Sequence, residues 1–374
     1  MQPVRFGVIG VGGMGGNHAR SFKEIEEAHL VAVADVNAET VQKVAVETGA
    51  TAFSDANDLI ENGDVEAILI ATPHFYHPPV AQYAASKGVH VLSEKPVAVT
   101  VSAADAMIEA AEKGGVLLGV MFQQRTEAVR QKMKAMIDQG ELGSIHRIAM
   151  SVPWYRPQAY YGSGAWRGTW KGEGGGILMN QAPHSLDQFL WLAGGSPQSV
   201  QAIVDTRLHT IEVENTALAI CDFGQGKIGS FYASTAEVPG GERVEIAGDK
   251  GILTLDDRGL RFFELETPIS QHLPTATGAF EAPKGAWREI PVEKSGGSHT
   301  LVTRAFCQAI RHHDASLMVA SGREGLQALE LANAILSAGY TRREVELPLN
   351  RAAFDAMLEK LQSGTKSEDL RASS

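Results

Sequence analysis

Lys95 stands where a positive charge could take part in chemistry. It belongs to the tripeptide Glu94-Lys95-Pro96, which directly follows the apolar run Val89–Leu92. If that run is a parallel strand, Lys95 lies at the carboxyl edge of the sheet, and the proline after it restricts the backbone and can hold a cis bond. A cation there could stabilise negative charge that develops on a reacting oxygen. A solvated surface lysine is the other interpretation.

His184 is the candidate for proton exchange. It follows a glycine-rich stretch, Gly172–Gly176, which we expect to open a helix. On that helix Asn180, His184 and Asp187 would be spaced i, i+4 and i+7 and would share one face. Imidazole has an ordinary pKa of about 6.5, so His184 could act as a base or an acid, with Asp187 orienting it. A purely structural histidine is the alternative.

A glycine pattern indicates a dinucleotide site. Gly10, Gly12 and Gly15 form G-x-G-x-x-G directly behind the apolar run Phe6–Ile9 and ahead of a predicted helix. In such turns the glycines allow a tight bend, a close approach to pyrophosphate and close helix packing, and the helix N-terminus supplies amide donors. Asp35 ends the next run, where a carboxylate can accept hydrogen bonds from ribose hydroxyls and would repel a 2′-phosphate. We therefore expect NAD rather than NADP, unless Asp35 is only a turn or cap residue.

Two further segments fit a site that binds a dinucleotide and a polar substrate. Ala71-Thr72-Pro73-His74 ends the central apolar run, at the strand edge where ligands bind in open α/β sheets, although a plain turn would also look like this. The stretch 154–170 is dense in aromatic residues and arginine, which suit a polyhydroxylated ring or a carboxylate, or else an interdomain or subunit contact. With Lys95 and His184, these features indicate hydride transfer to or from an alcohol or ketone.

The elements that would position these residues fall into two patterns. In the first third of the chain, continuous apolar runs alternate with helix-like segments, which predicts a doubly wound parallel sheet. These runs are Phe6–Ile9, Leu30–Ala34, Val65–Ala71, Val89–Leu92 and Val116–Val120. After a charged helix pattern over Glu127–Gln139, strands joined by turns predict a mostly antiparallel sheet. These strands are Ser144–Val152, Val200–Val204, Thr216–Asp222, Lys227–Ser234, Arg243–Ala247, Gly251–Asp256 and Leu260–Phe263.

The fold class is therefore α/β, with an N-terminal Rossmann unit and a C-terminal α+β domain. We place the Rossmann domain at 1–125, the substrate and oligomerisation domain at 126–345, and a C-terminal helix and tail at 346–374. Two late helices are expected over Ser298–His312 and Glu324–Ala338. Thr267–Lys294 is predicted to be a long surface loop, and Gly364–Ser374 a polar, frayed end.

The composition of the chain excludes several classes of binding partner. The 374 residues carry a net charge of -11, which disfavours nucleic acid and anionic lipid, and no apolar stretch reaches the roughly 18 residues of a membrane helix. Cys221 and Cys307 have no metal-like spacing, so we expect buried thiols, no disulfide framework and no metal site. The start of the sequence leaves no room for a secretion signal, so a cytoplasmic protein is expected.

Five motifs in order resemble the glucose–fructose oxidoreductase, inositol dehydrogenase and rhizopine-catabolism (Gfo/Idh/MocA) family over nearly the whole chain. They are Gly10–Gly15, Ala71-Thr72-Pro73 with His77, Glu94-Lys95-Pro96, Gly174–Gly176 through His184 and Asp187, and Val244–Gly248 with Gly251. The resemblance implies that Lys95 contacts the reacting oxygen and the ribose and that His184 exchanges the proton. It also implies that the second sheet builds oligomers, which we expect to be homodimers or homotetramers.

The resemblance also extends the candidate site. We assign the cofactor to Gly10, Gly12, Gly13, Met14, Gly15, Asp35, Thr72, Pro73, His77, Glu94, Lys95 and Gln123. We assign the substrate to Arg125, Trp166, Arg167, Asn180 and Asp187. Many family members have aspartate where this chain has Asn180, which removes a carboxylate from that position; Asn180 could still hydrogen-bond a substrate hydroxyl. The sequence around Asn180 looks like members that act on sugars and nucleotide sugars.

The function these predictions favour is hydride transfer between NAD and a secondary alcohol or ketone of a sugar, glycoside, cyclitol or nucleotide sugar. One alternative is an enzyme that keeps NAD bound and cleaves a glycoside through a transient 3-keto sugar. A second alternative is a non-catalytic, NAD-dependent sensor that binds a partner protein.

Overall fold

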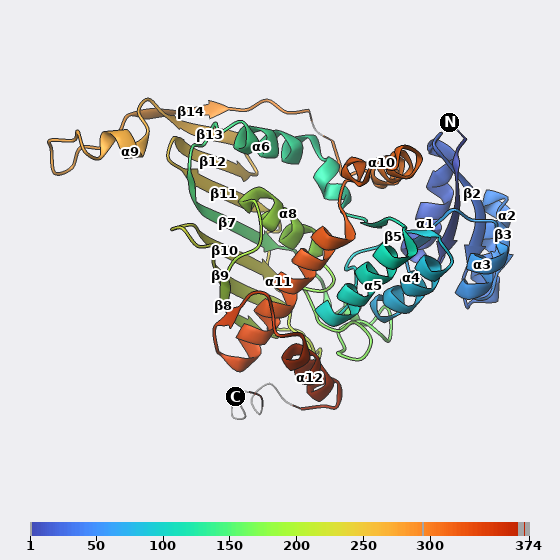
Figure 1. Cartoon of the computed structure of the whole chain (residues 1–374). Coiled ribbons are helices and arrows are strands. Elements are labelled where there is room, and N and C mark those ends of the chain that lie inside the picture. Colours follow the sequence, from blue (N-terminus) through green and yellow to red (C-terminus); the bar gives the residue numbers. More distant parts are fainter. Residues whose placement is uncertain (1, 294, 366–369, 371–374) are drawn as a thin grey trace. The chain divides into compact units, whose positions relative to one another are not determined.

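The chain folds into two compact units whose segments interleave along the sequence. In the computed structural model, residues 2–293, 295–365 and 370 are described (Figure 1). The first unit contains Met1–Thr126, Lys171–Gly174 and Gly297–Leu329. The second contains Glu127–Trp170, Gly175–Gly296 and Glu330–Ser374. Most of the predicted C-terminal tail, including 366–369 and 371–374, lies outside the described residues.

A six-stranded parallel sheet forms the centre of the first unit, in the order β3-β2-β1-β4-β5-β6. The strands are β1 (Val4–Ile9), β2 (Ala28–Ala34), β3 (Thr51–Phe53), β4 (Ala67–Ile70), β5 (His90–Ser93) and β6 (Leu118–Val120). The order runs outward from β1 in both directions, as in a doubly wound sheet. The predicted parallel sheet is confirmed, and β3 is a short strand that its sequence did not reveal.

Helices cover both faces of this sheet. They are α1 (Gly13–Ser21), α2 (Ala38–Thr48), α3 (Ala56–Asn62), α4 (His77–Ser86), α5 (Val101–Gly114) and α10 (His299–His312), with short 3-10 turns at Phe22–Glu24, His74–Tyr76, Gln123–Thr126 and Ala315–Leu317. One core cluster joins β1 to α1, α2 and α10, and in it the Phe6 ring lies 5.1 Å from Phe22 and 6.3 Å from Phe306. Double-sided burial explains why the strands read as continuous apolar runs.

A nine-stranded sheet forms the second unit, in the order β14-β13-β12-β11-β7-β10-β9-β8-β15. The strands are β7 (Ile145–Pro153), β8 (Ser199–Asp205), β9 (Thr216–Asp222), β10 (Ile228–Ser234), β11 (Arg243–Gly248), β12 (Gly251–Asp256), β13 (Gly259–Leu265), β14 (Gly285–Glu289) and β15 (Val345–Glu346). The β7–β10 pair is parallel, and the other pairs are antiparallel. The predicted, mostly antiparallel sheet is therefore confirmed.

The remaining helices are α6 (Ala128–Asp138), α7 (Gln158–Tyr161), α8 (Pro183–Ala193), α9 (Ile269–His272), α11 (Gly322–Thr341) and α12 (Arg351–Gln362). α8 contacts β7 and α6, whereas alternate side chains on β8 and β9 stay exposed. This sheet therefore has one covered and one open face. Among the described residues, no helix has an apolar stretch long enough to cross a membrane.

The predicted surface loop Thr267–Lys294 is only partly a loop. It contains the short helix α9, and residues Gly285–Glu289 form β14, which pairs with β13 through Arg261 to Leu265. The side chains of β14 are mostly exposed and bury little apolar surface. The strand is therefore stabilised mainly by its backbone hydrogen bonds to β13. A strand that depends on its neighbour leaves only a weak signal in its own sequence. This part of the loop prediction is wrong.

An ion pair at the start of β4 predicts acid sensitivity. The carboxylate of Glu66 receives Arg311 Nη1 at 2.8 Å and Nη2 at 3.0 Å, and these hydrogen bonds lower its pKa from 4.5 to about 2. A lowered folded-state pKa adds stability above pH 4.5 that is lost as the pH falls toward 2. We expect Arg311→Gln to lower the free energy of unfolding at neutral pH by about 1–3 kcal/mol. The gap to the wild type should narrow in urea titrations at increasingly acidic pH; a gap that stays constant with pH would contradict this assignment.

Candidate active site

The turn between β1 and α1, residues Gly10–Gly15, is referred to as the glycine turn. Its shape allows a ligand to approach the backbone closely. Gly10 has φ +83°, and a Cβ on Gly15 would lie 1.8 Å from the Gly10 carbonyl oxygen, so both positions need glycine for packing. A Cβ on Gly12 or Gly13 would meet no atom of the described residues within 4 Å. The protein itself does not require glycine at these two positions, and the open space in front of the α1 N-terminus fits a phosphate-bearing ligand.

Asp35 is tied to this turn. Its Oδ2 accepts a hydrogen bond from the Val11 amide at 2.9 Å, and its Oδ1 accepts one from the Asn37 amide at 2.9 Å. The carboxylate therefore stands at the carboxyl end of β2, directly beside the glycine turn. This is the place from which it could reach a ribose.

Two other predicted cofactor residues carry buried polar atoms without a protein partner. Within the described chain, Oγ1 of Thr72 and Oε1 of Gln123 are buried and form no hydrogen bond. Leaving such atoms unpaired costs about 1–3 kcal/mol each, so they fit a site that a polar ligand completes. Both belong to the first unit, together with the glycine turn and Asp35.

His77 joins two of the predicted segments. It is fully buried, its Nε2 lies 2.8 Å from the Thr72 carbonyl oxygen, and its Nδ1 lies 3.0 Å from that of Pro96. Burial lowers its pKa and favours the neutral ring. The geometry makes His77 a brace between the ends of β4 and β5. A direct cofactor contact for His77, as for Pro73 and Met14, stays a prediction.

Glu94 holds the backbone that carries Lys95. β5 ends at Ser93, and the Lys95–Pro96 bond is cis, as the sequence suggested it could be. The Glu94 carboxylate is buried, with Oε1 2.6 Å from His18 Nε2 and Oε2 accepting the Lys95 amide at 3.1 Å. Both carboxylate oxygens are thus used inside the protein, while Lys95 itself is half-buried.

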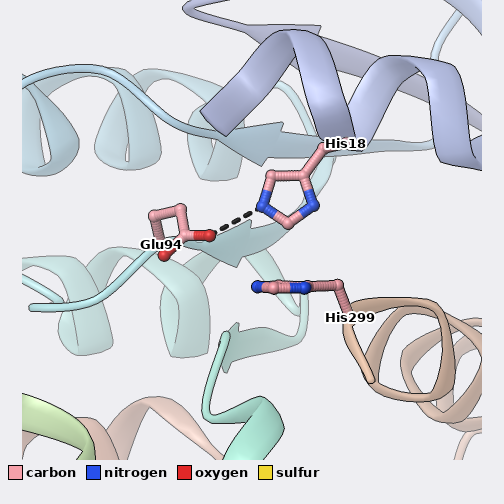
Figure 2. A group of neighbouring side chains, drawn as sticks. All are labelled: His18, Glu94 and His299. Carbon is pink, nitrogen blue, oxygen red and sulfur yellow. Dashed lines mark hydrogen bonds and ion pairs between the residues drawn. The ribbon is translucent and has the colours of Figure 1, made fainter. Parts of the chain in front are cut away.

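His18, Glu94 and His299 form a cluster that the sequence did not reveal (Figure 2). Their donor atoms lie within 4.8 Å of one another, and two imidazoles with a carboxylate are a donor set that zinc accepts. However, ligands of a tetrahedral zinc lie roughly 3.3 Å apart. The 2.6 Å between His18 and Glu94 is instead a hydrogen-bond distance. We interpret the cluster as a brace for Glu94, and the absence of a metal stays a prediction.

In the second unit, a buried glutamate clamps the glycine-rich segment. Glu214 is fully buried, and its carboxylate accepts the amides of Gly176 (2.9 Å) and Leu178 (3.1 Å). Its carbonyl oxygen accepts the Ile177 amide at 3.0 Å, and a Cβ on Gly176 would lie 1.7 Å from that oxygen. Glycine at 176 and glutamate at 214 therefore define the course of the chain ahead of α8.

Removing this clamp should destabilise the protein. Glu214→Ala leaves the two buried amides without an acceptor, so we expect the free energy of unfolding to fall by about 2–5 kcal/mol. Glu214→Gln keeps one acceptor oxygen and should lose less. Urea unfolding measures the difference, with Glu289→Ala on the exposed end of β14 as the matched control. If Glu214→Ala unfolded at the same urea concentration as Glu289→Ala, the clamp would carry no stability.

The predicted helix of this segment starts later than expected. α8 begins at Pro183, so His184 and Asp187 lie on it and are buried, whereas Asn180 precedes it in a turn. The prediction that all three share one helical face is wrong. The amides of Gly176 and Leu178 bond to Glu214, and Gly174 has φ +79°, so the chain before Pro183 follows the clamp instead of a helix.

Tyr160 connects three of the predicted substrate residues of the second unit, but not Asp187. Its hydroxyl accepts hydrogen bonds from Arg167 Nη1 at 2.6 Å and Gln181 Nε2 at 3.0 Å, and it lies 3.5 Å from Asn180 Oδ1. The Arg167 guanidinium lies 4.3 Å from the Trp166 ring centroid. Arg167, Trp166 and Asn180 thus form one polar and aromatic surface, whose centre, Tyr160, was not among the assigned residues.

Arg125 lies elsewhere, in the first unit. It is 5% exposed, and its Nη1 donates to Glu324 at 2.5 Å and to the Val319 carbonyl at 3.1 Å. These contacts fix the 3-10 turn that also holds Gln123. A substrate contact for Arg125 stays a prediction.

The chain is similar to known proteins over most of its length. A profile described as an oxidoreductase family with an NAD-binding Rossmann fold matches residues 4–122, and one described as the GFO/IDH/MocA C-terminal domain matches residues 130–254. The chain is 29% identical over 262 residues to myo-inositol 2-dehydrogenase of Thermotoga maritima, covering 68% of this chain and 75% of that protein. It is 30% identical to inositol 2-dehydrogenase of Arthrobacter sp. over 68% of this chain and 76% of that one.

One similar solved structure contains both a dinucleotide and a nucleotide sugar. The WlbA dehydrogenase of Bordetella pertussis, in complex with NADH and UDP-GlcNAcA, is 32% identical and has a TM-score of 0.78. The match covers 93% of this chain and all of that one.

Proposed function

The chain belongs to the GFO/IDH/MocA family of NAD-binding oxidoreductases, and we propose from this premise that it oxidises a secondary alcohol of a sugar substrate with NAD. One structural observation supports the binding of NAD. The glycine turn, Asp35, and the unpaired polar atoms of Thr72 and Gln123 all lie in one unit and fit a dinucleotide. The similar inositol and nucleotide-sugar dehydrogenases do not favour the glycoside-cleaving or sensor alternatives.

Each residue then has a chemical role. NAD, when bound, supplies the hydride acceptor. The amides of Gly12 and Gly13 would bind its phosphates, and Asp35 its ribose. His184 would remove the hydroxyl proton, and Lys95 would stabilise the negative charge that develops on the oxygen. Glu94 and His18 would keep the Lys95 backbone in place.

Asp35 supports NAD over NADP. A carboxylate at the end of β2 accepts ribose hydroxyls but repels a 2′-phosphate. We expect Asp35→Asn, which removes the charge but keeps an acceptor for the Val11 amide, to lower kcat/KM with NAD by about 10-fold and to raise activity with NADP. The ratio of kcat/KM for the two cofactors measures this preference. A wild-type enzyme that prefers NADP would overturn it.

The open face of the second sheet supports a homo-oligomer. Leu218 and Ile220 on β9, with Ile203 on β8 and Ile228 on β10, are 45–58% exposed on alternate residues. An apolar sheet face of this kind is typical of a subunit interface. We propose a homodimer or homotetramer through this face. Light scattering tests it, since a monomer at micromolar concentration would exclude it.

The remaining partners follow from charge and thiol chemistry. With a net charge of -11, we propose no nucleic-acid or membrane partner. Cys221 and Cys307 are buried free thiols, which fits a reducing, cytoplasmic compartment. Cell fractionation tests this location; recovery in an oxidising compartment would overturn it.

The function itself is tested with purified protein, excess NAD and a panel of inositols, aldoses, alkyl glycosides and nucleotide sugars. We expect NADH to appear with one class of substrate, and mass spectrometry of the product should show loss of two hydrogens. Cleaved glycoside without net NADH would overturn the proposal.

A further inference from the structure

Two arginines of the second unit lie against one tyrosine ring. The guanidinium carbon of Arg167 is 4.5 Å from the centroid of Tyr160, and that of Arg156 is 5.2 Å from the same centroid. We refer to Arg156 and Arg167 as the arginine pair. Both side chains are partly exposed. Two positive charges are therefore held against a single ring at the protein surface.

In the part of the chain that the structure describes, the arginine pair has no acidic partner. Among the described residues, no carboxylate lies within 4.0 Å of either guanidinium. Other arginines of the same unit do form such pairs, as Arg147 does with Glu245 and Arg261 with Asp256. Two like charges held near each other repel, and an anion bound beside them removes that repulsion. In a chain with a net charge of -11, this local excess of positive charge is a specific feature.

Aromatic rings lie close to both guanidinium groups. Arg167 lies over Trp166 as well as Tyr160, and Arg156 lies 5.1 Å from the Trp154 ring. Aromatic rings attract a guanidinium without using its N–H donors, so these donors stay available for a ligand. Among the described residues, each guanidinium donates one hydrogen bond, Arg156 to the Tyr155 carbonyl and Arg167 to the Tyr160 hydroxyl. Most of their donors therefore remain for an oxyanion, which arginine binds in a bidentate manner.

The arginine pair is connected to the chain that carries the proton-exchanging residue. The Tyr160 hydroxyl, which accepts from Arg167, also accepts from Gln181 and contacts Asn180. Asn180 and Gln181 lie immediately before α8, which carries His184 in its first turn. A group bound by the arginine pair is therefore placed beside the segment that would hold the reacting sugar.

We propose that the substrate is an anionic sugar, whose carboxylate or phosphate group is bound by Arg156 and Arg167. The inference rests on the proposed function, because it takes His184 and its neighbours as the sugar site. It narrows that function, since neutral sugars and inositols offer only hydroxyl groups. The chemistry common to both sources is an oxyanion attached to the sugar.

Matched substrate pairs test the proposal. Glucose is compared with glucuronate and with glucose 6-phosphate, by NADH formation and by calorimetric binding to the NADH-loaded protein. We expect the anionic member of at least one pair to bind at least about 10-fold more tightly, and its identity separates carboxylate from phosphate recognition. Calorimetry gives an answer even where no turnover occurs, so failure of the dehydrogenase proposal remains distinguishable.

Substitutions locate the effect. Arg167→Gln should weaken binding of the anionic sugar by about 10- to 100-fold while changing that of the neutral partner by less than about 3-fold. Tyr160→Phe keeps the ring but removes the hydroxyl, and should give a smaller loss. Arg258→Gln, at an exposed turn after β12, is the matched control and should change neither. Equal binding of neutral and anionic sugars, or an unchanged preference in Arg167→Gln, would overturn the inference.

Discussion

Replacing Lys95 with alanine is expected to lower kcat by roughly 10³-fold or more while NAD still binds. The ammonium group would be lost from the carboxyl edge of β5, where it would stabilise the oxygen as hydride leaves. The glycine turn and Asp35, which would bind NAD, are separate from it in the sequence and keep their own hydrogen bonds. The measurement is kcat from NADH formation, together with calorimetric titration of NAD.

Two further variants make this result specific to Lys95. Lys95→Arg keeps the charge but not the compact ammonium, and should recover only part of the rate. Lys87→Ala removes an exposed lysine of the same unit, paired with Glu61, and should leave kcat unchanged. Full turnover in Lys95→Ala would show that Lys95 has no part in the chemistry.

Replacing His184 with glutamine is the second large effect that we expect. Without an imidazole to take the hydroxyl proton, kcat should fall by about 10²–10⁴-fold. Hydroxide can partly replace a missing base, so the rate of the variant should rise toward alkaline pH and the gap to the wild type should narrow. A pH profile of kcat between neutral and alkaline values measures this change.

The control is the same histidine-to-glutamine substitution at a position outside the proposed site. His146→Gln, on the exposed start of β7, should leave both kcat and its pH profile unchanged. A His184→Gln variant that lost activity equally at every pH, with weakened folding, would indicate a structural histidine instead. That outcome would support the alternative interpretation from the sequence, in which His184 has a purely structural role.

Much of the fold was predictable because its signals are local. The runs Phe6–Ile9 and Leu30–Ala34 contain no polar side chain, since both faces of the parallel sheet are covered, and such continuity is visible in the sequence. Turn glycines and the alternation of the second sheet are equally local. By contrast, β3 and β14 are short strands that depend on a neighbouring strand, and the sequence did not reveal either one.

The sequence by itself determined the residues that could do chemistry: the glycine turn, Asp35, Lys95 and His184 each stand in a motif whose spacing is fixed along the chain. Only the tertiary structure decided what supports them. Glu214 lies 38 residues from Gly176, and His299 lies far beyond Glu94, so neither contact leaves a periodic or spaced pattern in the sequence. Such contacts arise when distant segments pack, because hydrogen bonding of buried polar groups depends on proximity in space.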